Sequence, residues 1–223
     1  LVEERRRLAA IGEVVSGVAH EIQNPIQNVV MGIDLVRAKL GTESPVERYL
    51  AQIERASESV RLLVRDLLDY SRSNRMDLEH VDLRTIVQGA IDETRGKAEQ
   101  AGVSIAWNPA GPAPAMIDPP RMRQVLLNLL MNAIEALPRG GRVEPRVAAL
   151  PDGGAEIAVC DDGPGMPADV LEKAFLPFFT TKARGTGLGL SIVHKIVQAH
   201  HGRVTLTSEP GKGTRIAITL PPP

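Results

Sequence analysis

The chain has 223 residues, of which 43% are hydrophobic, so it is long enough for one large domain or two small domains with buried cores. Its formal net charge of −1 and pI near 6.6 exclude a global field that would recruit nucleic acid or an anionic membrane. Aromatic residues make up only 3% of the chain, so few rings can stack on bases. We therefore expect aliphatic cores and no nucleic-acid partner.

Cysteine content and hydropathy restrict the compartment. Cys160 is the only cysteine, which excludes a disulfide framework and a cysteine-rich metal site and fits a reducing, cytoplasmic compartment. No apolar run approaches the ~20 residues that a membrane-crossing helix needs, and no signal peptide is visible. The chain begins LVEERRRLAAIG, without an initiator methionine and already in a helical pattern. We expect a C-terminal part of a longer protein, with any membrane attachment lying upstream.

Residues 3–40 show the apolar periodicity of a long helix. Apolar positions recur every three or four residues, with one slip between Ile22 and Ile26. They are Leu8, Ile11, Val15, Val18, Ile22, Ile26, Val29, Ile33, Val36 and Leu40. The slip brackets Pro25, where we expect a kink because the ring removes a backbone donor and crowds the preceding turn.

A second helix follows the short GTES break. Ser44 is a suitable cap, and Pro45 suits the first helical position. The alternation of three- and four-residue steps is then unbroken from Val46 to Tyr70. The two helices predict an antiparallel hairpin, which has only two seams to bury. We therefore expect an all-α domain over residues 1–76 that pairs with a second copy in a homodimeric four-helix bundle.

The pattern changes after SRSNRMDLEH, and residues 77–223 predict a separate α+β domain with helices layered on a mixed sheet. Pro145 should place its strand at an edge or a bulge, because proline cannot donate to a ladder. Residues 161–187 are rich in glycine and proline and are expected to form a loop region. We expect helices over 82–101, after Pro119-Pro120 and over 188–200, short strands at VSIAW and PAMID around a turn, and two hairpins turned by PDGG and EPGKG.

The stretch AHEIQNPIQN, residues 19–28, carries the first candidate site. On a helical wheel His20 lies about 160° from the centre of the apolar stripe, and Asn24 shares its face. A lone surface histidine is usually a solvated bystander. A neutral imidazole is also a nucleophile, which can accept a phosphoryl group when a neighbouring carboxylate such as Glu21 orients or deprotonates the ring.

Asn128 and Asn132, in NLLMNAIEA, are two amides one turn apart on an apolar helix. Buried amides need hydrogen-bond partners, so a structural role satisfied by backbone is one explanation. The other explanation is that Asn132 gives a hard oxygen to Mg²⁺ that is held mainly by phosphates.

DDGPGM, residues 161–166, follows an apolar strand and predicts a tight turn. Asp161 could accept a hydrogen bond from an amino group such as that of adenine. Alone this motif is weak, because Asp-Gly turns are common.

GTGLGLSIVHKIV, residues 185–197, crowds glycines at a helix N-terminus, where free amides and the helix dipole bind phosphate. The spacing is neither the GxGxxG dinucleotide fingerprint nor a P-loop. Lys182 and Arg184 lie just upstream and could meet phosphate charge. We expect Phe175 and Phe178, between the two glycine motifs, to form a hydrophobic clamp under a loop that could close over a ligand.

Taken in order, these motifs resemble the catalytic core of sensor histidine kinases of two-component signalling, over residues 8–220. HEIQNP is similar to the H box of that family, NLLMNA to the N box, DDGPGM to G1, FLPFFTTK to the F box, GTGLGL to G2, and GKGT to a third glycine turn. The resemblance implies a dimerisation and histidine-phosphotransfer hairpin and then a Bergerat-fold ATP-binding α+β sandwich. It also implies autophosphorylation from ATP, transfer to an aspartate of a response-regulator receiver domain, and dephosphorylation of that partner.

The resemblance also assigns roles to single residues. It implies that His20 is the phosphoacceptor, Glu21 its base, and Asn24 the residue that orients hydrolytic water. The implied nucleotide-binding residues of the second domain are Asn132 on Mg²⁺, Asn128 near the phosphates, Asp161 on adenine, Gly163 and Gly165 where the nucleotide approaches, and Lys182, Thr186, Gly187, Leu188 and Gly189 around the phosphates under a lid over 166–186.

Asn128 departs from the hydrolytic ATPases of this fold, which carry a glutamate base at that position. An amide cannot take a proton from water, which favours transfer to histidine over hydrolysis. Two alternatives remain open, a hydrolytic ATPase of the same fold and a dimeric scaffold that binds nucleotide. Gln23 stands where the family often has a basic residue, which bears on partner or phosphatase behaviour and not on the acceptor.

Overall fold

The computed structural model describes residue 22 and residues 25–39, 46–71, 76–109, 111–182 and 185–222. The chain separates into two compact units, one formed by residues 1–73 with 180–188 and the other by residues 74–179 with 189–223. The first unit is helical, and the second combines helices with a mixed sheet. The predicted fold class, a helical hairpin followed by an α+β sandwich, is confirmed.

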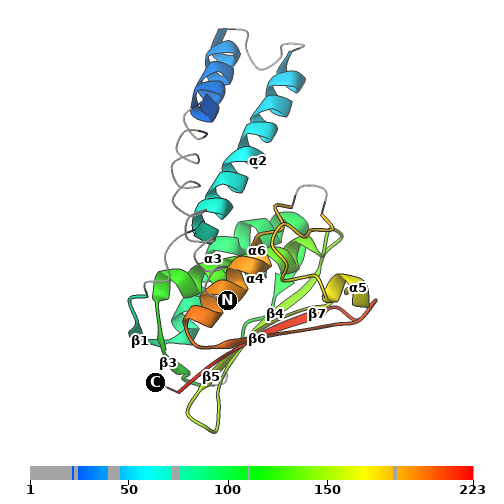
Figure 1. The fold of residues 1–223 in the computed structure, drawn as a ribbon. Coiled ribbons are helices and arrows are strands. Elements are labelled where there is room, and N and C mark those ends of the chain that lie inside the picture. The colour runs from blue at the N-terminus through cyan, green and yellow to red at the C-terminus, as the bar shows by residue number, and fades with distance from the viewer. Residues whose placement is uncertain are drawn as a thin grey trace. The chain divides into compact units, whose positions relative to one another are not determined.

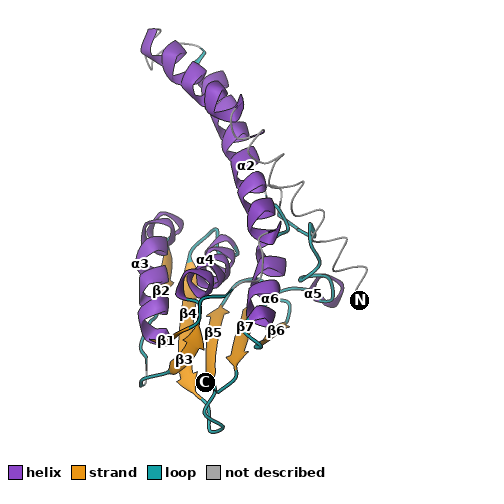
Figure 2. Ribbon diagram, turned by 60° about the vertical axis from the view of Figure 1, so that its left-hand side comes forward, coloured by secondary structure: helices purple, strands orange, loops and turns teal. Residues whose placement is uncertain are grey.

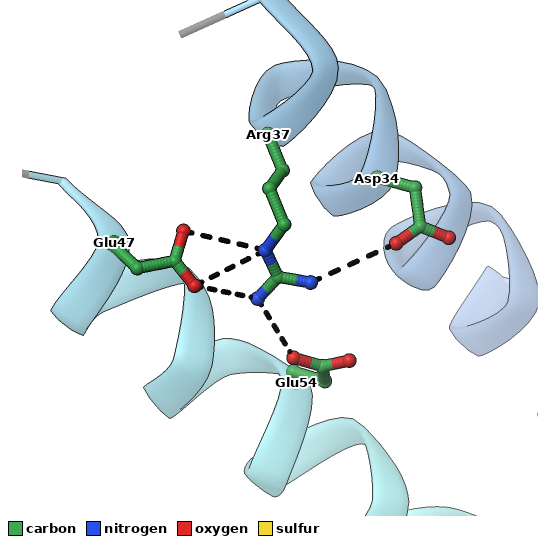
Figure 3. A network of polar contacts seen from close by, with 4 residues as sticks. All are labelled: Asp34, Arg37, Glu47 and Glu54. Carbon is green, nitrogen blue, oxygen red and sulfur yellow. Dashed lines mark hydrogen bonds and ion pairs between the residues drawn. The ribbon is translucent and has the colours of Figure 1, made fainter. Parts of the chain in front are cut away.

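In the first unit, the helical residues 25–39 run beside α2, Glu47–Ser71 (Figure 1). Arg37 joins the two helices (Figure 3): it donates to Oε1 of Glu47 from Nε at 3.1 Å and from Nη2 at 2.8 Å, and to Oε2 of Glu54 from Nη2 at 3.0 Å. The hydrogen bonds that Arg37 donates to Glu47 and Glu54 raise its pKa. The predicted cap at Ser44 and the turn before Pro25 lie outside the described residues.

Helix α2 presents two different faces in the single chain. Leu50, Ser57 and Val64 are buried and recur every seven residues. Four of the apolar positions predicted for this segment are between 37% and 52% exposed. They are Val46, directly before α2, and Tyr49, Ile53 and Val60 within it. Among the described residues, α2 therefore carries a stripe of exposed apolar side chains.

The second unit is built on a five-stranded sheet in the order β2-β4-β5-β7-β6. Strand β2 pairs parallel with β4, and the other neighbours are antiparallel, as expected for a mixed sheet. Its strands are β2 Val103–Ile105, β4 Gly141–Ala149, β5 Ala155–Asp161, β6 Arg203–Ser208 and β7 Thr214–Leu220. A separate antiparallel pair is formed by β1 Glu79–Asp82 and β3 Pro114–Ile117.

Three helices cover one face of this sheet: α3 Leu83–Ala101, α4 Pro119–Glu135 and α6 Gly189–Ala199 (Figures 1 and 2). The alternation along β4 agrees with this layering, because Val143 and Val147 are buried and Arg142 and Arg146 are exposed. Among the described residues, no helix combines the length and the apolar content that a bilayer crossing requires.

Three local features differ from or refine the predicted pattern. The strands in VSIAW and PAMID do not pair with each other, because PAMI pairs with β1, a strand that was not predicted. A short helix, α5 Ala168–Leu171, interrupts the expected loop region. Pro145 lies on β4 beyond Val143, where β2 no longer pairs and β4 has only β5 beside it, so its expected edge position is confirmed.

Candidate functional site

Helix α4 is positioned at its first turn. Oδ1 of Asp118 caps the helix by accepting from the Arg121 amide at 3.0 Å, and Pro119 occupies the first helical turn. The Asp118 amide donates to Nε2 of the buried His200 at 2.9 Å, and Nδ1 of His200 lies 2.8 Å from the Ile196 carbonyl as its donor. The imidazole therefore fixes the start of α4 against the end of α6.

Asn128 and Asn132 are half-buried on α4, beside the row of fully buried apolar residues. Nδ2 of Asn128 donates to the carbonyl of Gly189, the first residue of α6, at 3.4 Å. A Cβ placed on Gly189 would lie 3.8 Å from Nδ2 of Asn132 and 4.0 Å from Cγ of Asn128, which is ordinary van der Waals contact. The structure therefore brings the two amides to the N-terminus of α6.

Asp161 is the last residue of β5 and is half-buried. Its carboxylate accepts the Gly163 amide at 2.9 Å and also the amide of Thr214. Burial raises the pKa of Asp161, and the two amide hydrogen bonds oppose that shift. A carboxylate has about four lone-pair sites, so it can accept a further donor.

The loop after Asp161 needs glycine for reasons within the protein. A Cβ on Gly163 would lie 2.7 Å from Oδ1 of Asp161 and 3.5 Å from the carbonyl of Ala136. Gly165 has φ +67°, and a Cβ there would overlap the carbonyl of Glu209. This packing accounts for both glycines, so their predicted role in nucleotide approach remains a prediction.

Three separate stretches converge on the C-terminal half of α4. Ala136, which Gly163 contacts, ends α4 and donates its amide to the Asn132 carbonyl at 3.1 Å. Asn132 in turn lies beside Gly189. The carboxylate of Asp161, the side-chain amides of Asn128 and Asn132, and the N-terminus of α6 therefore lie around the C-terminal half of α4.

Four predicted phosphate-site residues, Lys182, Thr186, Gly187 and Leu188, lie in residues 180–188, which group with the helical unit. The Lys182 amide donates to Oγ1 of Thr180 at 3.1 Å, and the Leu188 amide donates to Oγ1 of Thr186 at 3.3 Å. Gly187 has φ +69°, a value that favours glycine. Their nucleotide roles remain predictions, as do those of His20, Glu21 and Asn24, which lie outside the described residues.

The structure contradicts the expected clamp of Phe175 and Phe178 at Phe178 and does not test it at Phe175. The Phe175 ring lies 5.6 Å from the His194 ring of α6, centroid to centroid. Phe178 is 64% exposed, with φ +65°, so it does not pack under a loop. The prediction was wrong for Phe178 because its left-handed backbone turns the chain and leaves the ring in solvent.

The described residues could supply only part of a Mg²⁺ coordination shell, with phosphates and waters supplying the rest. Among the residues that the structure describes, no three His, Cys, Asp or Glu side chains gather to hold a metal. Mg²⁺ commonly keeps several waters and takes one or two protein oxygens together with phosphates. The amide of Asn132 offers one hard oxygen of that kind.

Sequence reasoning missed two polar residues next to Asp161. Thr214 pairs with Asp161 across the sheet, and Ser208 pairs with Thr214. The signal in the sequence was the GKGT turn, which was recognised only for its glycines.

Two family models match the chain. One is the His Kinase A (phospho-acceptor) domain, over residues 10–75, and the other is the histidine kinase-, DNA gyrase B- and HSP90-like ATPase, over residues 117–223. The chain is 37% identical to the sensor histidine kinase ZraS of Escherichia coli O157:H7 over 99% of its own length, and it covers 48% of that relative. The chain therefore spans about half the length of the ZraS relatives that it matches.

Solved structures agree with these matches. Full-length ShkA in complex with AMPPNP aligns with a TM-score of 0.80 and 27% identity, over 94% of this chain and 45% of that one. The mycobacterial sensor histidine kinase MprB aligns with a TM-score of 0.59 and 30% identity, over 65% of this chain and 97% of that one. Histidine kinase ThkA in complex with response regulator protein TrrA aligns with a TM-score of 0.72 and 27% identity, over 98% and 64%.

Proposed function

The chain belongs to the family of sensor histidine kinases, and from this premise we propose that it binds ATP in its α+β unit and transfers the γ-phosphoryl group to His20. The observation that carries the proposal is the convergence of Asp161, Asn132 and Gly189 around the end of α4. These groups are suited to the two ends of a nucleotide, an amino group at one and phosphates at the other.

The base end is served by Asp161. Its carboxylate is held by the amides of Gly163 and Thr214, which fix its orientation while leaving acceptor capacity for the adenine amino group. A hydrogen bond to a charged acceptor is worth about 1.5–3 kcal/mol, enough to discriminate between purine bases. Asp161 would therefore set the preference for adenine.

The phosphate end is served by α4 and by the first turn of α6. Backbone amides at the N-terminus of α6 would donate to phosphate oxygens, and Asn132 would hold Mg²⁺. Bound Mg²⁺ would neutralise charge on the phosphates. The family motif also assigns Lys182, Thr186, Gly187 and Leu188 to phosphate binding, and we propose that role for them.

An amide at residue 128 favours transfer over hydrolysis. Nδ2 of Asn128 donates toward the Gly189 carbonyl, so a carboxylate at this position would face another oxygen. An amide also cannot take a proton from an attacking water. Both points count against a hydrolytic ATPase of the same fold.

The chemical step is an in-line phosphoryl transfer. A ring nitrogen of His20 forms a bond to the γ-phosphorus, the bond to the β–γ bridging oxygen breaks, and ADP leaves. Glu21 orients the ring or takes its proton. The phosphoryl group then passes to an aspartate of a response-regulator receiver domain, and Asn24 orients the water that removes it. The complex of ThkA with TrrA supports a partner of this class.

His20→Ala tests the acceptor. The variant should lose all acid-labile labelling by γ-labelled ATP and keep nucleotide binding, because the α+β unit is untouched. His80→Ala, at an exposed histidine of β1, is the matched control and should label like the wild type. Retained labelling of His20→Ala would overturn the assignment.

The kinase core should act as a homodimer. Among the described residues, the apolar stripe of α2 is exposed, with Ile53 at 46%, and a second copy of the hairpin would bury it. Ile53→Asp should shift sedimentation from dimer to monomer, whereas Gln52→Asp, at the exposed neighbour, should not. A monomeric wild type at micromolar concentration would contradict the proposal. We place this core in the cytoplasm, where ATP is supplied.

A further inference from the structure

Asp161 belongs to a row of polar residues that crosses three strands. In the register of the sheet, Asp161 of β5 lies opposite Thr214 of β7, and Thr214 lies opposite Ser208 of β6. Side chains that are directly opposite on neighbouring strands point to the same face of a sheet. Thr214 is buried, with 8% of its surface exposed, and Ser208 is half-buried.

The hydroxyl of Ser208 joins three segments. Oγ donates to the Gly213 carbonyl at 2.8 Å, accepts the Met166 amide at 2.8 Å, and lies 3.0 Å from Oγ1 of Thr214. A hydroxyl has one proton to donate and two lone pairs. Because the proton of Ser208 goes to Gly213, Thr214 donates to Ser208, and the full capacity of the Ser208 hydroxyl is used.

Close backbone contacts at two glycines hold the same segments together. Gly213 has φ +81°, and a Cβ there would overlap the Asp161 carbonyl, just as a Cβ on Gly165 would overlap the Glu209 carbonyl. The Gly211 amide donates to the Pro164 carbonyl at 2.7 Å. The turn between β6 and β7 and the loop after Asp161 are therefore held together by backbone contacts.

Ser208 is placed to control the orientation of the Asp161 carboxylate. The hydroxyl of Thr214 donates to Ser208, and the backbone amide of Thr214 is one of the two amides that hold that carboxylate. Met166, the other partner, ends the loop that carries the second amide, that of Gly163. The positions of both backbone amides that orient the Asp161 carboxylate therefore depend on the Ser208 hydroxyl, which is not proposed to contact the ligand.

We infer that Ser208 is a positioning residue for adenine recognition: its hydroxyl ties Thr214 to Met166 so that Asp161 faces the amino group of the base. This inference rests on the proposed binding of ATP. A loss of the hydroxyl would leave the protein folded around its glycine interlock, but the carboxylate would take up several orientations.

The test compares ATP with inosine triphosphate, which carries a carbonyl in place of the adenine amino group, by calorimetric titration of the whole chain. Ser208→Ala should weaken ATP binding about tenfold, the size of one good hydrogen bond. Binding of inosine triphosphate should change less than about threefold, because its contact with Asp161 is already lost. Ser208→Thr, which keeps the hydroxyl, should restore most of the preference for ATP.

Thr207→Ala is the matched control. Thr207 is the exposed neighbour of Ser208 on β6, and its hydroxyl makes only one long contact, 3.4 Å to the Arg215 carbonyl. This variant should bind both nucleotides like the wild type. A structural role alone would weaken ATP and inosine triphosphate equally in Ser208→Ala, and that result would overturn the inference.

Thr214→Val keeps the test decisive if Ser208→Ala does not fold. It removes the hydroxyl that donates to Ser208 while keeping the branched shape, and should also lower the ratio of ATP affinity to inosine triphosphate affinity. An unchanged ratio would overturn the inference. A wild type that binds neither nucleotide would instead overturn the proposed function, whereas a wild type that prefers ATP with an unchanged ratio in both variants would overturn only the role of Ser208.

Discussion

The two ends of the proposed nucleotide site are built in opposite ways. At the base end, Gly163, Gly165 and Gly213 are in contact with protein backbone or side chains that leave no room for a methyl group. At the phosphate end, Gly189 has ordinary clearance from Asn128 and Asn132. The base end is therefore shaped by the protein itself, while a methyl group at Gly189 would meet the two asparagines only at van der Waals distance.

This difference separates two reasons for a glycine in a binding loop. A glycine whose methyl group would overlap backbone is required for folding, whatever the protein binds. A glycine with ordinary clearance from protein atoms and without positive φ needs a different explanation, such as the close approach of a ligand. Only the second kind is informative about function, and in this site Gly189 is the described example.

The largest expected effect comes from adding a methyl group at each end. Gly213→Ala should destabilise the α+β unit by about 4 kcal/mol or more, because the new Cβ overlaps the Asp161 carbonyl and the backbone has φ +81°. Gly189→Ala should change stability by less than about 1 kcal/mol, since alanine suits a helix. It should nevertheless reduce ATP affinity at least about tenfold, because the methyl group fills the space beside the phosphates. Thermal unfolding and calorimetric titration measure the two outcomes.

Gly211→Ala serves as a second comparison for the first result. Gly211 also has positive φ, +78°, but a Cβ there meets nothing within 4 Å. It should therefore lose only about 1–2 kcal/mol from backbone strain. If Gly213→Ala lost no more stability than Gly211→Ala, the close packing of Gly213 against the Asp161 carbonyl would not exist in solution.

The next effect separates binding from stability at the base end. Asp161→Asn should weaken ATP binding between about tenfold and a hundredfold, because a charged acceptor is replaced by a neutral amide. Stability without ligand should not fall, since the variant no longer buries a charge. Asp162→Asn is the control, because Asp162 is exposed and its Oδ1 accepts the Arg142 amide at 2.7 Å, which an asparagine can also do. Equal ATP affinity in both variants would contradict the role of Asp161.

Most of the helices and strands that carry this site could be predicted from the sequence. The contacts between distant segments that complete the site mostly could not. Strands β4 to β7 and helices α4 and α6 follow from local periodicity and turn residues, which need no knowledge of distant partners. Strand β1 escaped prediction because EHVD has four residues without apolar alternation, and it is a strand only through its pairing with β3. Long-range pairing of this kind is invisible to local patterns.

The same limit applies to the site itself. Asp161 and Asn132 could be named from their motifs, and their roles toward the nucleotide remain predictions. That Ser208 joins Thr214 to Met166 could not be predicted, because the three residues meet only when β6, β7 and the loop after β5 assemble. Phe178 failed for a different reason, since a left-handed backbone at a phenylalanine runs against its own preference.

A smaller effect should appear with pH. Burial raises the pKa of Asp161 above its ordinary value of 3.8, so the folded chain binds this proton more tightly than the unfolded chain does. Relative to Asp161→Asn, the ligand-free wild type should lose stability as pH rises from 3.8 through the raised pKa, and keep that deficit above it. ATP affinity should fall at low pH, where the carboxyl is protonated. Unfolding midpoints of both proteins between pH 4 and 7 test this, and a constant difference would contradict it.

The smallest effect lies at the far end of α6 from Gly189. His201 has φ +57° and closes a Schellman turn, in which the Gly202 amide donates to the Val197 carbonyl at 2.9 Å and the His201 amide to the Gln198 carbonyl at 2.9 Å. His201→Gly should stabilise the α+β unit by about 0.5–1 kcal/mol, because glycine adopts this conformation without steric cost. The unfolding midpoint should rise by a few degrees, while ATP affinity stays unchanged.

His201→Ala, which removes the exposed imidazole without relieving the backbone, should show no such rise. The two ends of one helix would then respond in opposite ways, with Gly189→Ala changing binding and His201→Gly changing only stability. If His201→Gly altered nucleotide affinity as strongly as Gly189→Ala, α6 would act as a unit, and clearance at Gly189 would no longer distinguish a residue kept for its ligand.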